Sequence, residues 1–567
     1  MSSRSWKTRL QPALVALALA NPTHAAYAGW MSIATHDSAG QAASARGWWL
    51  EFALVLLVFF IHGGAPAPQM NETYYLAKAK HYWDPAWCAG DLFLESADAH
   101  LAFYWTVGWL AKLFSLPTVA WIGRVAAWAF LAWSWQRLCC TVMRKPFNAV
   151  LGAALLVWLT SEHDFAGEWL VGGVEGKCFA YACVFAALAA LVKERWNQAW
   201  PWFGLAGAFH VLVGGWAALT AGCVWLFERR EERPALASMT PALALAFLLT
   251  LPGLIPALQL SSGVSAETSR EACQIYVFER LPHHLAPLSQ DSAVVLKRVM
   301  KFSLPLLAFV LLWWLATKSN GQARSIDIAL NRICRIAAWS FIFSFAALNW
   351  EIVCSDHLAL AASLLRFYWF RLADVAVPMA AAVLVCYWIE RLLRDESRYA
   401  PLALSIALAL AGWHLASATL DRWQDPTPPA DRKLAAPAAW RETCEWIRDH
   451  TPADAICLVP RASQSLSWYA NRKSLVTWKD VPQDAASIVA WRDRYFDVFW
   501  HDDEFGEHVP FGSLAEQGTS RIRELAAKYG VDFVVTREYP PLGFPIAYAN
   551  AWYAVYAVSP AAQESLK

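Results

Sequence analysis

The stretch GWWLEFALVLLVFFIHG, residues 47–63, is the first in the chain with the length and apolar character of a membrane-spanning helix. A helix crosses the hydrocarbon core of a bilayer with about 17–25 residues, and stretches of this kind recur as far as residue 419. Of the 567 residues, 57% are hydrophobic and the mean hydropathy is +0.30, whereas soluble proteins average roughly 45–50% apolar residues. We therefore expect a mostly α-helical, polytopic membrane protein.

The apolar stretches predict about eleven membrane crossings, within a transmembrane domain that covers residues 47–419. Lys and Arg residues between the stretches orient them, because short basic loops stay on the cytoplasmic side. Residues 1–46, with Arg4, Lys7 and Arg9, are then expected to form a cytoplasmic leader. The protein is expected in the inner or plasma membrane, with membrane lipid as its first partner.

Two segments depart from a simple crossing. Residues 101–116 contain Lys112 and end just before Pro117, so we expect a helix that lies in the outer interface. Residues 199–227 begin and end beside basic clusters, which predicts a hairpin of two short legs with His210 at its apex, buried in protein. Four loops then face the outside: residues 64–116, 161–176, 261–301 and 351–371.

The last part of the chain, residues 420–567, has an ordinary composition and predicts an α/β domain. A Pro-rich linker leads into it, at residues 425–437. Helical and β-like patterns then alternate, at residues 440–450, 455–459, 520–528, 531–535 and 552–558. Because the number of crossings before it is odd, we expect this domain on the extracytoplasmic face, together with the four outer loops.

Composition also excludes several functions. The net charge is +1 and no basic stripe is present, so nucleic acid is not an expected partner. None of the twelve Cys residues belongs to a CxxC pair, so the sequence indicates neither a zinc site nor a disulfide framework. Many of the 34 Trp residues stand near the ends of apolar stretches, where indole rings favour the membrane interface.

The first outer loop carries an unusual number of carboxylates. Glu72 stands a few residues beyond the first span, where a carboxylate at a cavity mouth would serve as general base on an acceptor; equally, it would suit the first turn of a helix. Asp91 is a second candidate catalytic acid. Together with Glu95 and Asp98 it also offers oxygen ligands for Mg²⁺ or Mn²⁺, although the spacing matches no fixed metal motif.

A second group of polar residues stands in the short outer loop 161–176. His163 and Asp164 are candidates for completing a catalytic site, and Lys177 follows directly as a candidate substrate ligand. The glycines of this loop indicate a tight backbone path. The alternative is that these polar groups only satisfy one another within the loop.

Cations and histidines form a third group, in the two later outer loops. Arg280, His283 and His284 belong to the first of these loops, and Arg366 and Arg371 to the second. Guanidinium groups match phosphate oxygens, so we expect these residues to hold a lipid phosphate. The alternative is that they extend to the interface as long basic side chains commonly do.

With these residues in place, the chain resembles the GT-C superfamily of polytopic glycosyltransferases, most nearly the protein O-mannosyltransferase and aminoarabinose-transferase branch. Such proteins carry an acidic residue or an Asp-Glu pair early in the first outer loop, then an aromatic residue and Ala, a Gly-Asp, and an apolar Tyr-Trp helix. The matching residues stand here in that order: Asn71-Glu72, Tyr74, Ala77, Gly90-Asp91 and Leu101–Trp105. Asn71 replaces the first acid of the pair. The chain also looks like a group of uncharacterised bacterial multi-pass membrane proteins.

The resemblance implies that Glu72 is the catalytic base of an envelope enzyme that takes a sugar from a polyprenyl-phosphate donor. The lipid tail would lie in the membrane and the acceptor outside. We therefore expect an inverting, lipid-linked sugar transferase. Two alternatives remain: a non-catalytic scaffold or assembly protein of the envelope, which Asn71 favours, and a transporter, which would need ionisable residues along a path through the spans.

Overall fold

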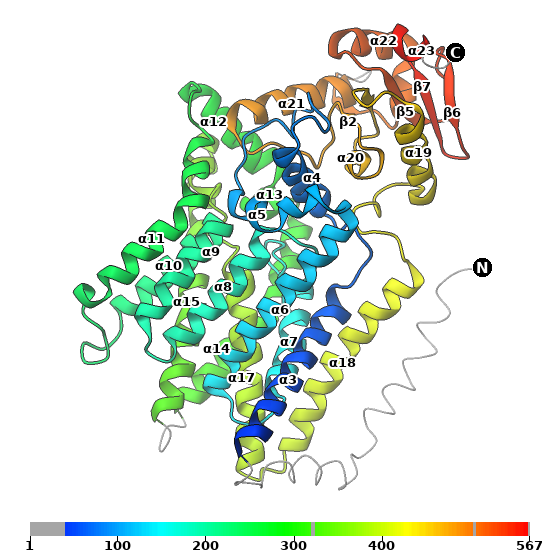
Figure 1. Cartoon of the computed structure of the whole chain (residues 1–567). Coiled ribbons are helices and arrows are strands. Elements are labelled where there is room, and N and C mark those ends of the chain that lie inside the picture. The colour runs from blue at the N-terminus through cyan, green and yellow to red at the C-terminus, as the bar shows by residue number, and fades with distance from the viewer. Residues whose placement is uncertain (1–39, 319–323, 503–505, 565–567) are drawn as a thin grey trace.

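The computed structural model describes residues 40–318, 324–502 and 506–564 (Figure 1). Most of the expected leader, residues 1–39, lies outside these ranges. Each apolar stretch identified in the sequence forms a helix. These helices are α3 (Gly40–Gly63), α6 (Leu116–Val142), α7 (Asn148–Glu162), α8 (Gly176–Leu191), α9 (Trp196–Phe209), α10 (Val211–Leu226), α11 (Leu236–Gln259), α14 (Ser292–Lys318), α15 (Arg324–Val353), α17 (Ala373–Arg394) and α18 (Ala400–Gln424).

Six helices in the described part of the chain are long and apolar enough to cross a membrane: α6, α11, α14, α15, α17 and α18. Apolar segments of α3, α7, α8 and α10 are shorter. The protein is therefore mostly helical and multi-pass, as expected. The number of crossings and the side on which each end lies stay predictions.

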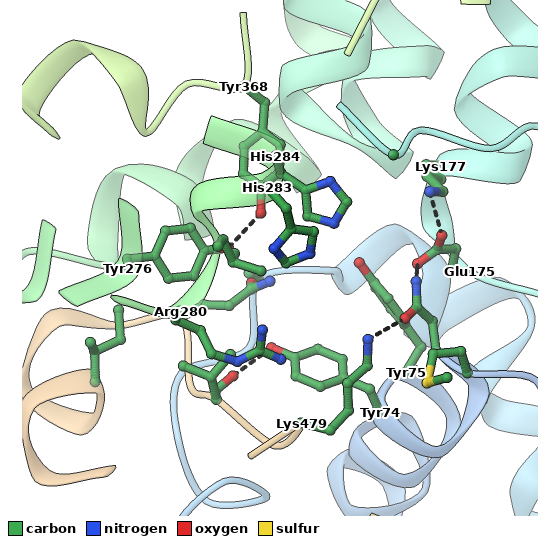
Figure 2. Close-up of a pocket in the computed structure, with 18 of the residues that line it drawn as sticks. Tyr74, Tyr75, Glu175, Lys177, Tyr276, Arg280, His283, His284, Tyr368 and Lys479 are labelled. Carbon is green, nitrogen blue, oxygen red and sulfur yellow. Dashed lines mark hydrogen bonds and ion pairs between the residues drawn. The ribbon is translucent and has the colours of Figure 1, made fainter. Parts of the chain in front are cut away.

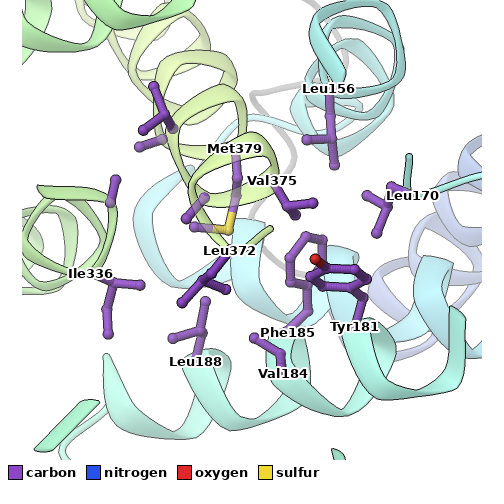
Figure 3. Close-up of a cluster of buried hydrophobic side chains, with 14 of the residues drawn as sticks. Leu156, Leu170, Tyr181, Val184, Phe185, Leu188, Ile336, Leu372, Val375 and Met379 are labelled. Carbon is purple, nitrogen blue, oxygen red and sulfur yellow. The ribbon is translucent and has the colours of Figure 1, made fainter. Parts of the chain in front are cut away.

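Helix α17 lies at the centre of this bundle. In its most apolar window 78% of the residues are buried, against 17% in α11, α14 and α18, whose faces are left for lipid. Figure 3 shows the packing around α17: Val375 and Met379 lie against Phe185 and Leu188 of α8 and Ile336 of α15. The core of the membrane part around α17 thus consists of aliphatic and aromatic side chains.

The predicted hairpin is present as α9 and α10, with His210 between them. Small residues bring these helices and α11 into backbone contact. A Cβ atom on Gly214 would lie 2.2 Å from the backbone nitrogen of Gly207, and one on Gly253 would lie 2.2 Å from the Gly207 carbonyl oxygen. Only glycine fits such contacts, which are a common means of packing membrane helices.

At one end of the bundle, short elements join the long helices and form a polar layer (Figure 1). Residues 101–112, expected as part of one helix in the outer interface, form two short helical pieces. These short elements are α4 (Glu72–Trp83), α5 (Leu101–Thr106), the 3₁₀ helix Gly108–Lys112, α12 (Ala266–Gln274), the π-helix Ile275–Arg280, α13 (Pro282–Leu285), the 3₁₀ helix Pro287–Ser289 and α16 (Leu358–Leu365).

The C-terminal part is built on a five-stranded sheet in the order β2-β1-β5-β7-β6, with a separate hairpin of β3 and β4. Strand β1 pairs in parallel with β2 and β5, and β7 runs antiparallel to β5 and β6. The strands are β1 (Ile456–Leu458), β2 (Lys473–Ser474), β3 (Trp500–Asp502), β4 (His508–Pro510), β5 (Phe533–Arg537), β6 (Ile546–Ala549) and β7 (Tyr553–Ala557). The helices are α19 (Pro437–His450), α20 (Leu466–Ala470), α21 (Ala485–Phe499), the 3₁₀ helix Leu514–Gln517, α22 (Gly518–Tyr529) and α23 (Pro560–Glu564).

This sheet-containing part docks on the polar layer, at the end of the bundle where α4, α5 and α12 lie (Figure 1). Its core continues into α12 through Ala272. The backbone nitrogen of Ala485 donates to the Leu260 carbonyl at 2.8 Å, and the Tyr74 hydroxyl donates to the Val481 carbonyl at 3.0 Å. The two parts of the chain therefore share one interface.

Candidate functional site

A cavity of about 1460 Å³ lies at this interface. Its walls come from three sources: the ends of the long helices, the outer loops, and the C-terminal part. Figure 2 shows labelled side chains from all three converging on the same space. Because segments more than 400 residues apart form its walls, as Asn71 and Lys479 do, the cavity exists only in the folded chain.

The polar lining of the cavity is mainly basic. Eight cationic side chains line it: Lys177, Arg280, Arg366, Arg371, Lys433, Arg461, Lys479 and Arg492. Three carboxylates line it, all from the membrane part of the chain: Glu168, Glu175 and Glu279. A cavity walled in this way attracts an anion.

Only three of these eight cations, Lys177, Arg371 and Arg492, form an ion pair with a carboxylate of the described chain. Arg280 and Lys479 are two of the five that do not. Arg280 is 6% exposed, donates its Nε hydrogen to the Trp478 carbonyl at 2.9 Å and lies 5.0 Å from the centre of the Trp478 ring. Lys479 donates to the Asn71 side-chain oxygen at 2.7 Å. Among the described residues, no carboxylate oxygen lies within ion-pair distance of either group. Burying a cation without an ion-pair partner is costly, which makes Arg280 a candidate contact for an anionic ligand.

The ionisation of neighbouring groups reflects the same positive field. Burial, reinforced by the charge of Arg280, lowers the pKa of Lys479 to about 8. Burial and then the charges of Arg280, Arg298 and Lys479 lower the pKa of His283 to about 4. His283 is therefore neutral at pH 7, and Lys479 is largely charged. The charges of Glu175 and Asp480 act in the opposite sense on Lys479, so nearby acids partly offset the positive field that a bound anion would meet.

On the other side of the cavity, cations and carboxylates are paired. Lys177 lies 3.0 Å from Glu175 and 3.2 Å from Glu168. Glu168 also pairs with the Nε of Arg371 at 3.0 Å, and Arg371 contacts a ring nitrogen of His210 at 2.6 Å. Glu175 therefore has one cationic partner, Lys177, which it shares with Glu168. Glu168 has two cationic partners, Lys177 and Arg371.

Asn71 connects the two sides. Its side-chain nitrogen donates to Glu175 at 3.2 Å, and its side-chain oxygen accepts from Lys479 at 2.7 Å. An amide side chain can donate to a carboxylate and accept from an ammonium group at once without carrying a charge. Asn71 therefore joins Glu175 and Lys479 through one uncharged side chain.

The candidate substrate ligands named from the sequence all line this cavity. They are Lys177, Arg280, His283, His284, Arg366 and Arg371. Helix ends and the π-helix bring them together from three separate loops. His284 contacts the Ala166 carbonyl, and Arg366 donates to the Cys273 sulfur at 3.1 Å. Their assignment to a phosphate stays a proposal.

Glu72, expected as the catalytic base, does not line the cavity. It is fully buried and forms a two-pronged pair with Arg124, with both N···O distances 2.6 Å. The backbone nitrogens of Gln69 and Val174 also donate to it, at 2.8 and 3.0 Å. Both of its oxygens are therefore occupied by structural contacts, and none is left for an acceptor.

The three acids expected as metal ligands do not converge. Asp91 is buried and accepts from the backbone nitrogens of Phe93, Leu94 and Ser474 at 3.0–3.2 Å. Glu95 accepts from the Gly90 backbone nitrogen, and Asp98 pairs with Lys78 at 3.6 Å. In the part of the chain that the structure describes, no three His, Cys, Asp or Glu residues are grouped as metal ligands. These acids shape the first loop and do not fit Mg²⁺ or Mn²⁺, nor does Asp91 line the cavity as a catalytic acid.

His163 and Asp164 also lie away from the lining. A ring nitrogen of His163 contacts the Lys301 carbonyl at 2.9 Å, and burial raises the pKa of Asp164. The turn that follows is fixed by Asp374, which accepts from the backbone nitrogens of Phe165 and Ala166 at 2.9 and 2.8 Å. His163 and Asp164 thus belong to the loop that supports the cavity.

Sequence reasoning missed Glu168, Glu175 and Lys479 as site residues. For Glu175, a signal was present in its position two residues before Lys177, in a glycine-rich loop. Lys479 stands within the predicted C-terminal domain, with no local feature that separates it from a surface lysine. Its role depends on a contact with Asn71 that only the fold creates.

Comparison with known proteins gives one family match and several structural ones. A domain of unknown function, DUF6798, matches residues 438–498, the segment that contains Lys479. No curated protein matches the chain by sequence.

Solved structures with a similar overall plan include the Archaeoglobus fulgidus oligosaccharyltransferase with zinc and sulfate, at 14% identity and a TM-score of 0.45, over 86% of this chain and 67% of that one. The same organism's AglB, in complex with an inhibitory peptide and a dolichol-phosphate, is 12% identical, with a TM-score of 0.47, over 86% of this chain and 69% of that one. ArnT from Cupriavidus metallidurans is 14% identical, with a TM-score of 0.41, over 92% of this chain and 99% of that one. Each is a likeness in overall plan at low sequence identity.

Proposed function

We propose that the protein is an integral-membrane glycosyltransferase that moves a sugar from a polyprenyl-phosphate donor to an acceptor on the extracytoplasmic side. The observation that supports this most directly is the pair Arg280 and Lys479, which form no ion pair within the described chain and line a cavity at the ends of the membrane helices. A phosphate on a membrane-embedded lipid would be presented at this depth.

The phosphate is proposed to bind between Arg280 and Lys479. Charge-assisted hydrogen bonds of this kind are about twice as strong as neutral ones. The terminal nitrogens of Arg280 lie on the same guanidinium whose Nε is fixed by the Trp478 carbonyl, so the group is held before the ligand arrives. A preorganised donor set is also what stabilises the negative charge that develops on a leaving phosphate.

The base is proposed to be Glu175. It lines the cavity, is 1% exposed, and is held by Lys177 and Asn71. Glu168 is the poorer candidate because two cations, Lys177 and Arg371, stabilise its charged form. In the reaction Glu175 takes the proton of the acceptor, the acceptor atom bonds to the anomeric carbon, and the bond from that carbon to the phosphate oxygen breaks.

The leaving polyprenyl phosphate keeps the electron pair of the broken bond and remains on Arg280 and Lys479. Attack from the face opposite the phosphate would invert the configuration at the anomeric carbon. The acceptor proton passes to Glu175 and then to water, so charge and atoms balance.

The test uses the full chain in lipid nanodiscs, with radiolabelled polyprenyl-phosphate sugars and an extract of envelope glycans as acceptor. Glu175→Gln should lower transfer by about 10²–10⁴-fold, the usual contribution of a general base, and should keep donor binding. The matched control is Glu442→Gln, an exposed glutamate of α19, which should behave as wild type. Full transfer by Glu175→Gln would refute the assignment.

The same assay separates the alternatives. A non-catalytic scaffold would show no transfer in any lipid composition, and a transporter would carry the labelled lipid across the bilayer without forming a glycosylated product. Either result, with donor binding intact, would replace the transferase proposal.

A further inference from the structure

The C-terminal part contributes only cations to the charged lining of the cavity. Lys433, Arg461, Lys479 and Arg492 come from it, whereas every lining carboxylate in the described chain comes from the membrane part. Lys479 is turned toward Asn71. Lys433 acts on His283, as Lys479 does, whereas Arg461 and Arg492 have no role in the donor phosphate site proposed above.

Aromatic rings accompany these cations. Trp478, Tyr495, Phe496 and Trp500 line the cavity, and their rings pack in sequence: Trp478 and Tyr495 have centroids 4.9 Å apart, and Phe496 and Trp500 5.1 Å. We call these four residues, with Arg461 and Arg492, the C-terminal wall. Flat rings offer surfaces on which the apolar faces of sugar rings can stack.

The two arginines of the wall differ in their partners. Arg492 pairs with Glu279 at 3.3 Å and Asp493 at 3.6 Å. Arg461 makes no ion pair within the described chain, and only its carbonyl is engaged, by the Trp478 backbone nitrogen at 3.0 Å. Arg461 is therefore the cation of this wall whose charge is free for a ligand.

The size of the cavity leaves room for a second ligand. Pockets for one small molecule measure about 300–1,000 Å³, and this one measures about 1460 Å³. The charges of Arg461 and Arg280 both act on Tyr495, so the C-terminal wall adjoins the proposed phosphate site. A second ligand on this wall would lie next to the donor, as transfer requires.

We propose that the C-terminal wall binds the acceptor, and that the acceptor is an anionic saccharide, with Arg461 as its anion contact and the aromatic rings as its stacking surface. This inference rests on the proposed transferase function. Both a carboxylate and a phosphate group on the sugar satisfy the same chemistry, and the probes below distinguish them.

The experiment measures binding in the absence of donor, by calorimetry on the full chain in nanodiscs. Three probes of similar size are compared: tetragalacturonate, a phosphorylated maltotetraose and neutral maltotetraose. We expect at least one anionic probe to bind ten or more times as tightly as the neutral one. Which of the two does so identifies the group.

Arg461→Gln should weaken the anionic probe about tenfold and leave the neutral probe unchanged, while binding of polyprenyl phosphate stays as in the wild type. Lys479→Gln should do the reverse, weakening the lipid phosphate and sparing the saccharide. Arg537→Gln, an exposed arginine at the end of β5, serves as the charge-matched control.

Equal affinity for neutral and anionic probes, or an unchanged anionic affinity in Arg461→Gln, would overturn the inference. So would equal losses of lipid and saccharide binding in Arg461→Gln, because the two sites would then be one. Failure of the transferase proposal looks different: polyprenyl phosphate would not bind the wild-type chain, whatever the saccharides do.

Discussion

Two buried glutamates near Asn71, Glu72 and Glu175, have different surroundings. Glu72 is its neighbour in sequence and is enclosed by Arg124, with both oxygens bonded and no contact with the cavity. Glu175 lies 104 residues away and is joined to Asn71 by a hydrogen bond inside the cavity. The difference shows that a carboxylate's surroundings, more than its place in a motif, decide whether it supports the fold or the chemistry.

The largest expected difference between the two glutamates is in their contribution to stability. Glu72→Gln should lower the free energy of unfolding by about 3–5 kcal/mol, the usual result of leaving a buried charge unpaired, because Arg124 is fully buried. Thermal unfolding in detergent measures this. Glu175→Gln should unfold close to the wild-type temperature.

Replacing both Glu72 and Arg124 by leucine should recover most of that loss, since an apolar pair needs no counter-charge. A Glu72→Gln variant that is as stable as the wild type but has lost transfer activity would contradict the structural role of Glu72, because Glu72 would then act in the chemistry.

A second test concerns the uncompensated cations. Arg280→Gln and Lys479→Gln should each weaken donor binding about 10–100-fold, since a hydrogen bond to a charged group contributes about 1.5–3 kcal/mol. Filter binding of labelled polyprenyl phosphate measures the loss. Lys473→Gln, on β2 outside the lining, is the control, and an equal loss there would point to nonspecific attraction.

A third test changes Asn71 to Asp, the residue that the GT-C resemblance would place there. The new carboxylate would pair with Lys479 and repel Glu175, since Asn71 contacts both. We expect donor affinity to fall about tenfold and the pH optimum of transfer to rise, because a like charge raises the pKa of a carboxyl group. Asn71→Ser, which adds no charge, should cost less donor affinity; a larger loss in Asn71→Ser would contradict this account.

The smallest effect is a pH dependence. Because the pKa of Lys479 is about 8, its ammonium group is charged below that pH and neutral above it. Donor affinity should therefore decline several-fold between about pH 7 and pH 9. Lys479→Arg should remove the decline, because arginine stays charged throughout this range, and a decline of the same size in that variant would exclude Lys479 as its source.

Hydropathy was sufficient to predict the helices of the membrane part, because the pattern that identifies a span is local. The same holds for β1, β5 and β7, whose apolar stretches stand apart from their neighbours. The cations of the outer loops could be predicted as well, since a basic residue in a loop at the mouth of a bundle has few other places to lie.

The role of Glu72 could not be predicted in this way. Its partner Arg124 stands inside an apolar stretch 52 residues later, where hydropathy offers no reason to expect a cation that faces the loop. Lys479 is a similar case, because its contact with Asn71 joins the two ends of the chain. Both pairings depend on tertiary contacts that leave no periodic trace in the sequence.

The separation of charge across the cavity also explains why composition concealed the site. A net charge of +1 over 567 residues describes an electrically balanced molecule, yet the carboxylates that line the cavity come from the membrane part, and the charged side chains that the C-terminal part adds to the lining are all cations. The C-terminal part therefore forms a positively charged side of the cavity. An anion would be attracted toward it, whether the anion approaches from solution or from the bilayer.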